Sequence, residues 1–281
     1  MREEPKIRFT WIIHYSCNYR CPYCFYYEGS GWEILGKRNV YLAPDEWLEH
    51  WQRIYNKYGR CYVAITGGEP FTYPNFIELV NKLSRMHYPI NISTNSSGDF
   101  SSFVKEVCPE RLSLSLAFHP QFDDLSVFLE RIEFLKKNNF DRQVNLLAYP
   151  PYLNNFKYYI NTFESIGEKI KIIFFRGIYK DISYPIGYTE EEKNLIGFTQ
   201  EWFNKIRKKG SICYAGKQSG LLLPDGEVSR CGQLWYNCII GNFFDSDFKL
   251  LDQPQDCTVE ACPCNEDILW GEENTIEYSS S

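Results

Sequence analysis

Short apolar segments alternate with amphipathic segments along the first 180 residues of the chain. The apolar segments are rich in β-branched and aromatic residues and are bounded by turn or polar residues, which is typical of strands. These predicted strands cover residues 7–14, 61–66, 89–94, 111–118, 143–149 and 169–176. Helical patterns lie between them at residues 43–59, 73–87, 123–139 and 154–167. Asp45 is the expected N-cap of the first of these helices, and Gly59 its expected end.

This alternation predicts an α/β fold, because successive parallel strands need crossover connections that helices usually supply. About six strand–helix units fit within the first 180 residues. That number favours a partial (β/α)6 TIM-like barrel, placed at residues 1–188, over a complete eightfold barrel. An open doubly wound sheet is the competing architecture.

The residue composition and periodicity of the chain change after the predicted barrel. A connecting helix is expected over residues 189–210, where acidic residues open the segment and basic residues close it, as the helix dipole favours. Residues 211–281 are rich in Cys, Gly and Asp and have little helical periodicity, which predicts a small Cys-rich C-terminal domain. Within it, residues 221–232 are expected to form a hairpin around the turn Pro224-Asp225-Gly226.

Charge and composition exclude some classes of partner. The 281-residue chain has a net charge of −6 and no basic stretch, so nucleic-acid binding is not expected. No apolar run reaches membrane-spanning length and the N-terminus has no signal-peptide pattern, so we expect a cytoplasmic protein without a membrane partner. Disulfides rarely persist in that compartment, and the 11 cysteines therefore indicate metal or redox chemistry.

Three of these cysteines, Cys17, Cys21 and Cys24, have the spacing C-x3-C-x2-C directly after the first predicted strand. In a β/α barrel, this position is on the face where active sites lie. One loop can direct three thiolates to three corners of a 4Fe–4S cluster and leave the fourth iron open for a small chelating ligand. A zinc site is the alternative, although structural zinc normally has four ligands in paired spacings.

Together with Tyr23 before the last cysteine, this motif resembles the signature of the radical S-adenosylmethionine (radical SAM) superfamily. The resemblance implies a 4Fe–4S cluster whose open iron is chelated by the amino and carboxylate groups of SAM. It implies that reduction cleaves SAM to a 5′-deoxyadenosyl radical, which takes a hydrogen atom from a substrate carbon. The protein's part is then to position the reactants and exclude water, with the electron supplied by a flavodoxin- or ferredoxin-type donor.

The segment Gly67-Gly68-Glu69-Pro70 follows the second predicted strand. Its glycines allow a close backbone approach and positive φ values. In the resembled family such a segment binds the methionine amino group of SAM, and the resemblance extends that role to these four residues. An ordinary glycine turn would be the alternative for the two glycines alone.

The ends of later predicted strands carry further candidates. Ser93 and Asn95 resemble the family's polar segment near the SAM ribose. Ser115 is expected to reach SAM. His119 is expected at the mouth of the barrel as a catalytic residue, with a structural role as the alternative. Arg176 is expected to meet a carboxylate of SAM or substrate, with a surface ion pair as the alternative.

The C-terminal cysteines form a second group. The frame C-x12-G-x4-C, from Cys213 through Gly226 to Cys231, resembles the start of the SPASM and twitch auxiliary-cluster domains. The following "CTVEACPC" departs from the usual SPASM pattern, which has more cysteines at longer spacings. The resemblance implies a second, auxiliary 4Fe–4S cluster, with zinc as the alternative. Its candidate ligands are Cys213, Cys231 and two of Cys257, Cys262 and Cys264.

The resemblance leaves the reaction open. The leading hypothesis is two-electron oxidation (dehydrogenation) of a small polar substrate, whose second electron the auxiliary cluster would accept. A second is epimerisation, in which the Cys238 thiol would give a hydrogen atom to the product radical; loop packing is the other role for Cys238. A third is modification of a ribosomally made peptide. A non-catalytic iron–sulfur electron carrier or a zinc-binding module is the alternative class. The long connection at residues 25–39 is expected to fold over SAM or the substrate.

Overall fold

A nine-stranded sheet organises the chain, with strand order β13-β12-β11-β1-β2-β3-β4-β5-β6. The computed structural model describes residues 5–24, 26, 31–199, 207–232, 235–259 and 261–262, and of residues 31, 32, 207, 208, 235, 261 and 262 the backbone only. The six strands predicted for the barrel are β1 (Arg8–Ile12), β2 (Tyr62–Thr66), β3 (Ile90–Thr94), β4 (Leu112–Phe118), β5 (Asp141–Ala148) and β6 (Ile170–Phe174). They pair in parallel and in chain order, which confirms the predicted partial barrel.

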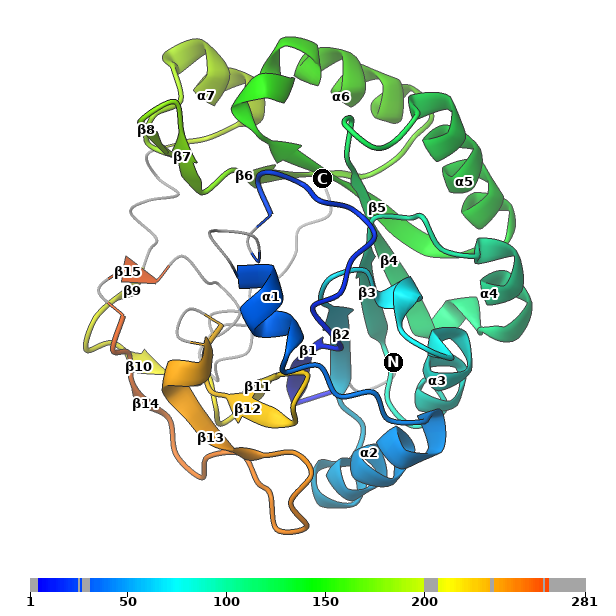
Figure 1. Cartoon of the computed structure of the whole chain (residues 1–281), viewed down its shortest axis with the longest axis vertical. Helices are drawn as coiled ribbons and strands as arrows, with labels where there is room; N and C mark the ends of the chain where they lie inside the picture. Colours follow the sequence, from blue (N-terminus) through cyan, green and yellow to red (C-terminus); the bar gives the residue numbers. More distant parts are fainter. Residues whose placement is uncertain are drawn as a thin grey trace.

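Helices cover the outer, convex side of this curved sheet (Figure 1). They are α2 (Pro44–Tyr58), α3 (Phe76–Leu83), α4 (Phe100–Glu106), α5 (Leu125–Lys137) and α6 (Phe156–Ser165). Short 3-10 helices precede several elements: η1 (Pro70–Thr72), η2 (Pro109–Arg111) and η3 (Pro150–Asn155). A further short helix, α1 (Gly31–Gly36), lies on the concave side, within the connection at residues 25–39. The remainder of that connection is described only in part, so its predicted covering role stays a prediction.

Several helix boundaries differ from the prediction, among them that of α3, which covers Phe76–Leu83 within the expected range 73–87. Within the range 189–210, where one helix is expected, α7 covers only Glu190–Ile196 and Gly197 ends it with a left-handed φ of 68°. Arg207–Lys208 form strand β9, and residues 200–206 lie outside the described residues. Thr189 caps its N-terminus by accepting a hydrogen bond from the backbone of Glu192. The first long helix begins at Pro44, so Asp45 lies in its first turn rather than at the N-cap, and its carboxylate pairs with Lys82 at 2.6 Å.

The predicted C-terminal hairpin extends the barrel sheet. Strands β11 (Ser219–Leu222) and β12 (Glu227–Ser229) are antiparallel around the expected turn, and β13 (Ile239–Asn242) follows on β12. β11 also pairs in parallel with β1, from Arg8 opposite Ser219 to Trp11 opposite Leu222. The first strands of the predicted C-terminal domain therefore belong to the same sheet as the barrel strands. The domain boundary near residue 211 stays a prediction.

Small strand pairs complete the described chain. They are β7 (Gly177–Tyr179) with β8 (Ile182–Tyr184), β10 (Ile212–Cys213) with β14 (Gln255–Asp256), and β9 (Arg207–Lys208) with β15 (Ala261–Cys262). The 3-10 helix η4 (Trp235–Cys238) precedes β13. Within the described ranges, every helix is too short or too polar to cross a bilayer.

An aromatic core lies between α2 and the outer face of β1. The rings of Trp11 and Trp47 are 4.6 Å apart, and Phe9 contacts Trp51 edge-on at 5.5 Å. Phe243, just after β13, packs on Trp51 at 4.9 Å. These aromatic side chains hold α2, β1 and the C-terminal hairpin together.

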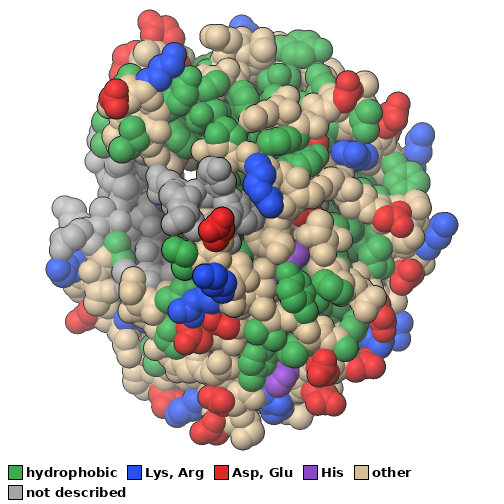
Figure 2. Space-filling view, in the orientation of Figure 1, with side chains coloured by type: hydrophobic (Ala, Val, Ile, Leu, Met, Phe, Trp, Pro, Cys, Tyr) green, Lys and Arg blue, Asp and Glu red, His purple; other side chains and the backbone are tan. Residues whose placement is uncertain are grey.

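The two faces of the sheet differ in polarity because side chains alternate along each strand. The outward residues are apolar and buried, for example Val63, Ile65, Ile90 and Ile92. Many inward residues are polar, including Thr10, Asn91 and Ser113. On the outside of the molecule, acidic and basic side chains are mixed around the rim of the face drawn in Figure 2. The concave side of the sheet is therefore the polar interior of the partial barrel.

Candidate active site

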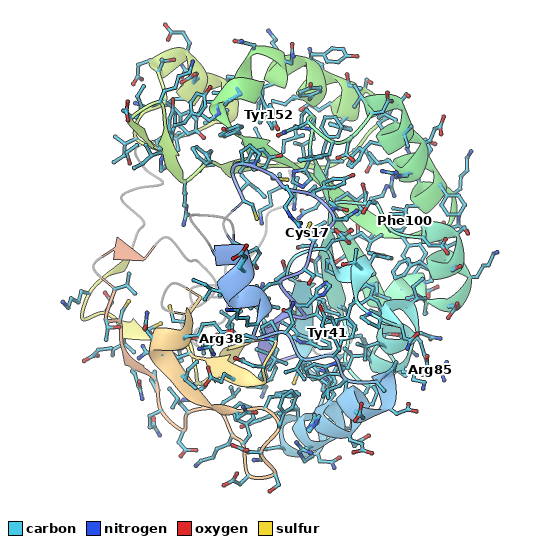
Figure 3. All side chains as sticks on the ribbon, in the orientation of Figure 1. Cys17, Arg38, Tyr41, Arg85, Phe100 and Tyr152 are labelled. Atoms are coloured by element: carbon cyan, nitrogen blue, oxygen red, sulfur yellow. The ribbon has the colours of Figure 1, made fainter. Side chains whose placement is uncertain are left out.

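The loop that leaves β1 brings the three N-terminal cysteines to one cavity. Cys17, Cys21 and Cys24 all line a space of about 290 Å³ at the carboxyl ends of the barrel strands, which we call the cysteine cavity. Figure 3 shows Cys17 on the inner side of the curved sheet. The loop turns tightly here: the backbone N–H of Cys24 donates to the carbonyl of Cys21 at 3.0 Å, and that of Tyr19 donates to Cys17 Sγ at 3.3 Å.

This donor set fits an iron–sulfur cluster with one open iron. All three donors are cysteine thiols that line one cavity. Within the described residues, no group of three or more His, Cys, Asp or Glu is arranged to hold a metal ion. The thiols therefore surround a space rather than a point. Burial raises the pKa of Cys17, and that of Cys21 to about 12, so ligation would release thiol protons.

Gly67 and Gly68 also line the cysteine cavity, where β2 ends. Gly67 has a φ of 143°, and a Cβ there would lie 2.3 Å from the carbonyl oxygen of His14. A Cβ on Gly68 would lie 1.8 Å from the carbonyl oxygen of Ser16. The Gly68 N–H donates to His14 at 2.8 Å. The glycines thus allow this turn to lie directly against the backbone that leads into Cys17.

Glu69 and Pro70 are placed differently from the two glycines. Both are buried, and neither lines the cysteine cavity. The Glu69 carboxylate accepts hydrogen bonds from the Thr94 hydroxyl and the Asn95 N–H, both at 2.7 Å, and from the Phe71 N–H at 3.1 Å. Burial raises the pKa of this carboxyl, while the three donors oppose that rise. Glu69 therefore joins the loops after β2 and β3, and its predicted contact with SAM remains untested.

The loop after β3 supports the cysteine loop from the other side. Ser93 and Asn95 line the cysteine cavity, and their contact with the SAM ribose stays a prediction. The Asn95 side-chain amide donates to Asn18 Oδ1 at 2.9 Å and lies 3.9 Å from Cys17 Sγ. Asn18 in turn donates to the Ser97 hydroxyl at 2.8 Å. These amides fix the position of the loop beside Cys17.

His119 follows β4 and faces the cysteine cavity together with Tyr23. Their rings stack at 5.9 Å, and Tyr23 Oη lies 2.9 Å from His119 Nδ1. The same nitrogen is 3.8 Å from Cys21 Sγ. Burial lowers the pKa of His119 to about 4, which favours the neutral ring. The Nδ1 atom of a neutral ring can accept a hydrogen bond from the Tyr23 hydroxyl. His119 thus contacts the cysteine loop, and its catalytic role remains a prediction.

Two other predicted residues lie away from this cavity. Ser115 lines a second, more polar cavity towards the amino ends of the strands, because it is two residues before Ala117, the β4 residue that faces the cysteines. Arg176 is exposed and lines neither cavity. Other residues that line the cysteine cavity were not predicted. Tyr19 and Tyr26 lie in the loop after β1, whereas Thr66, Ala117, Asn145, Leu147 and Ile173 lie on barrel strands, where the alternation of side chains could have identified them.

The structure brings two of the predicted C-terminal ligands together. Cys213 on β10 and Cys257 just after β14 belong to one small buried cluster with Ala215. The Cys257 N–H donates to the Ser211 carbonyl at 2.8 Å, which continues the β10–β14 pairing. The side chain of Cys262 is not described, and Cys264 lies outside the described residues.

Cys231 and Cys238 lie near each other at the end of β12. The Ser229 hydroxyl donates to the carbonyls of Cys231, at 3.0 Å, and Cys238, at 3.5 Å. Burial raises the pKa of Cys238, and the nearby Cys231 contributes to that rise. Cys238 lines neither cavity of the barrel. Its thiol is therefore grouped with the C-terminal cysteines rather than with the predicted substrate site.

The family model for the radical SAM superfamily matches residues 11–154. Among curated proteins, GTP 3',8-cyclase of Aquifex aeolicus (strain VF5) is 30% identical over 104 residues, which is 36% of this chain and 32% of that protein. Mycofactocin maturase MftC of Mycobacterium tuberculosis (strain CDC 1551 / Oshkosh) is 33% identical over 94 residues, 33% of this chain and 22% of that protein. The alignments thus span a third or less of either relative.

A solved structure shares the fold over most of the chain. The structure of native anSMEcpe with bound AdoMet and Cp18Cys peptide has a TM-score of 0.63 and 20% identity, and the match covers 86% of this chain and 78% of that one. The family uses a 4Fe–4S cluster and SAM, and Cys17, Cys21 and Cys24 are the residues that match its signature. From the family model over half of its length and the three-thiol cavity at the strand ends, this chain belongs to the radical SAM superfamily.

Proposed function

We propose that this protein cleaves SAM reductively and removes a hydrogen atom from a carbon of a polar substrate. The observation that carries the proposal is the convergence of three thiols with Gly67 and Gly68 on one cavity. When bound, the cluster and SAM supply the radical chemistry. The thiols of Cys17, Cys21 and Cys24 would hold the cluster, and the Gly67-Gly68 turn would meet SAM.

The remaining residues of the cavity would position the reactants and exclude water. Tyr23 and His119 close the side of the cavity beside Cys21, where their stacked rings form a wall. Ser93 on β3 and Asn95 directly after β3 supply polar groups, and the Asn95 amide lies beside Cys17. Tyr152, whose hydroxyl is 3.4 Å from that of Tyr23, continues the wall outward (Figure 3). Fixing these groups before reaction lowers the cost of orienting the substrate.

Two-electron oxidation is the first candidate for the overall reaction. It requires an acceptor for the second electron, and the C-terminal cysteines are the residues that would hold an auxiliary cluster. The approach of Cys213 to Cys257, and of Cys231 to Cys238, supports that assignment. Epimerisation with Cys238 as the hydrogen donor is less well supported, because Cys238 lines neither barrel cavity.

Modification of a peptide is the second candidate. It is favoured by the similarity to a structure with a bound peptide and to a protein named as a maturase. The two candidates differ in the size of substrate that stimulates SAM cleavage. A small molecule would suffice for the first, whereas the second requires a peptide chain.

Iron and sulfide content after anaerobic reconstitution tests the cluster assignments. We expect about eight irons in the wild type and about four after replacing Cys17, Cys21 and Cys24 with alanine. Replacing Cys213 and Cys257 should remove the remaining irons, about four in number. Cys108→Ala, a thiol outside both groups, is the control. If the wild type holds only about four irons and the variant without Cys17, Cys21 and Cys24 holds none, the protein has no auxiliary cluster. The oxidation route would then be abandoned.

Product analysis separates an enzyme from an electron carrier. A reductant such as dithionite or a flavodoxin-type donor should release 5′-deoxyadenosine from SAM with the wild type. The variant lacking Cys17, Cys21 and Cys24 should release none. A wild-type protein that holds its clusters and still releases none would be an electron carrier, contrary to the proposal.

A further inference from the structure

A second cavity, of about 550 Å³, occupies the barrel interior beyond the cysteine cavity. We call it the polar cavity. The two cavities share Thr66, Ser93, Asn145 and Ile173, so they meet in the carboxyl-terminal half of the strands. In a closed β/α barrel this interior is a packed layer of branched apolar side chains. Here most of the lining positions are polar and the side chains leave open space, so the interior has room for a ligand.

Most polar side chains of this interior bond to one another. The Asn91 amide donates to the Ser113 hydroxyl at 2.9 Å, and the Gln143 amide donates to the Ser115 hydroxyl at 3.1 Å. Ser115 also donates to Asn91 Oδ1 at 3.2 Å. These residues of β3, β4 and β5 therefore form a fixed polar wall.

Asn145 is the exception in that wall. Its neighbour on β4 is Ala117, which offers no polar side chain, and its neighbour on β6 is Lys171. The Oδ1 atom of Asn145 is buried and has no hydrogen-bond partner among the described residues. A buried amide oxygen without a partner is costly unless a ligand satisfies it. Asn145 lies where the two cavities meet.

Lys171 supplies a positive charge beside Asn145. Within the described part of the chain Lys171 forms no ion pair, whereas Lys169 on the same face pairs with Asp141 at 3.9 Å. Arg142, which also lines the polar cavity, is paired with Glu168. Asp141 is the one acidic side chain among the described residues that line this cavity. The polar cavity therefore has an excess of positive charge.

We propose that the polar cavity binds the anionic end of the substrate, a carboxylate or phosphate, with Lys171 contacting the anion and Asn145 accepting a hydrogen bond from an adjacent hydroxyl or amide N–H. The inference rests on the proposed function, because it gives the substrate class of that site. An ammonium beside an amide selects an anion that carries a neighbouring hydrogen-bond donor. The opposite end of such a substrate would face the cysteine cavity.

A competing role for Lys171 has to be distinguished. β6 is the last strand of the sheet, and lysines on edge strands also protect against edge-to-edge association. That role depends on charge at the edge and not on Asn145. It would also be shared by Lys169, which precedes the same strand and lines the same cavity.

Calorimetric binding to the reconstituted protein with saturating SAM tests the proposal. The probes are L-malate, which carries a carboxylate beside a hydroxyl, inorganic phosphate, and uncharged glycerol. We expect malate or phosphate to bind and glycerol not to bind, and the tighter of the two anions identifies the source of the negative charge. Lys171→Met and Asn145→Asp should each weaken anion binding by about tenfold or more. Lys169→Met, the matched control, should change it by less than about twofold.

Several results would overturn the inference. One is anion binding by Lys171→Met or by Asn145→Asp that is as tight as anion binding by the wild type. Others are glycerol binding that is as tight as anion binding, and a wild type that binds neither anion. Aggregation of both lysine variants with unchanged anion binding would assign Lys171 to edge protection instead. Binding requires no reductant. Intact anion binding without SAM cleavage would therefore count against the proposed function alone, and intact cleavage without anion binding against this inference alone.

Discussion

The Glu69 carboxylate accepts a 2.7 Å hydrogen bond from the Thr94 hydroxyl, so the turn after β2 is joined to the end of β3 behind the cysteine cavity. Two backbone N–H groups, of Asn95 and Phe71, complete its partners. Glu69 is fully buried, and its three donors all belong to segments next to cavity residues. The carboxylate therefore orders the loops that carry the site.

We expect Glu69→Gln to destabilise the protein. The amide NH2 would face a hydrogen-bond donor at a buried site, which costs about 1–3 kcal/mol of unfolding free energy. Urea denaturation measures the loss. The control is Glu78→Gln, whose side chain is 50% exposed, and its expected change is below about 0.5 kcal/mol. Equal losses in the two variants would show that the buried carboxylate does not organise these loops.

Gly68→Ala should displace the cysteine loop. Its Cβ would lie 1.8 Å from the Ser16 carbonyl oxygen, which directly precedes Cys17. We expect the reconstituted variant to lose about four irons relative to wild type. Gly36→Ala is the control, because a Cβ at Gly36 meets nothing within 4 Å. Full iron content in Gly68→Ala would mean that the loop tolerates the displacement.

Arg230→Met should separate the C-terminal cysteines. The buried Arg230 guanidinium donates to the carbonyls of Ala215, Gln255 and Asp256 at 2.9–3.1 Å, which holds the segments of Cys213 and Cys257 against the end of β12. Loss of these bonds should speed maleimide labelling of Cys213 and Cys257 in the metal-free protein. It should also reduce the iron content of the proposed auxiliary cluster, while the proposed cluster of Cys17, Cys21 and Cys24 remains.

Arg85→Met is the matched control, because Arg85 is exposed on the outside of the molecule (Figure 3). Its labelling rates and iron content should equal those of wild type. Unchanged labelling in Arg230→Met would show that the β10–β14 pairing alone holds the two thiols.

His87 should make the protein less stable in acid. Its ring is fully buried, with Nδ1 accepting from the Cys61 N–H at 3.0 Å and Nε2 bonded to the Trp51 carbonyl at 3.2 Å. Burial lowers the pKa of His87 from 6.5 to about 4. The unfolded state therefore binds more protons between these values, and the contribution of His87 to stability is lost as pH falls from 6.5 towards 4. The full effect is on the order of 3 kcal/mol.

Denaturation at pH 7 and pH 4.5 measures this effect. His87→Gln should reduce the difference in unfolding free energy between the two pH values. His50→Gln is the comparison, since His50 is half-buried and its ring lies on the outer helix α2. A His87→Gln variant with the wild-type pH difference would contradict the assignment.

The local sequence pattern was enough to predict the barrel strands and the loop that carries Cys17, Cys21 and Cys24. The strands β1–β6 and helices α2, α5 and α6 lie within about two residues of their predicted positions, because periodicity and turn residues act locally. The match of Cys17, Cys21 and Cys24 to one cavity follows from their spacing on a single loop after a strand. Helix α7 was overpredicted because Gly197 ends a segment whose charge pattern continues beyond it.

Contacts between distant segments were decided by the tertiary structure. The parallel pairing of β11 with β1 joins residues more than two hundred positions apart, and local patterns carry no information about such a partner. Glu69 was expected to contact SAM because of its place in the Gly67-Gly68-Glu69-Pro70 segment. In the structure, the Thr94 hydroxyl and the Asn95 N–H instead donate hydrogen bonds to its carboxylate behind the cysteine cavity. Ser115 and Ala117 differ by two strand positions, and only the register of β4 against its neighbours assigns them to different cavities. The sequence by itself therefore determined the family, the barrel strands and the three-cysteine loop. The direction of each buried polar group depended on partners that folding brings together.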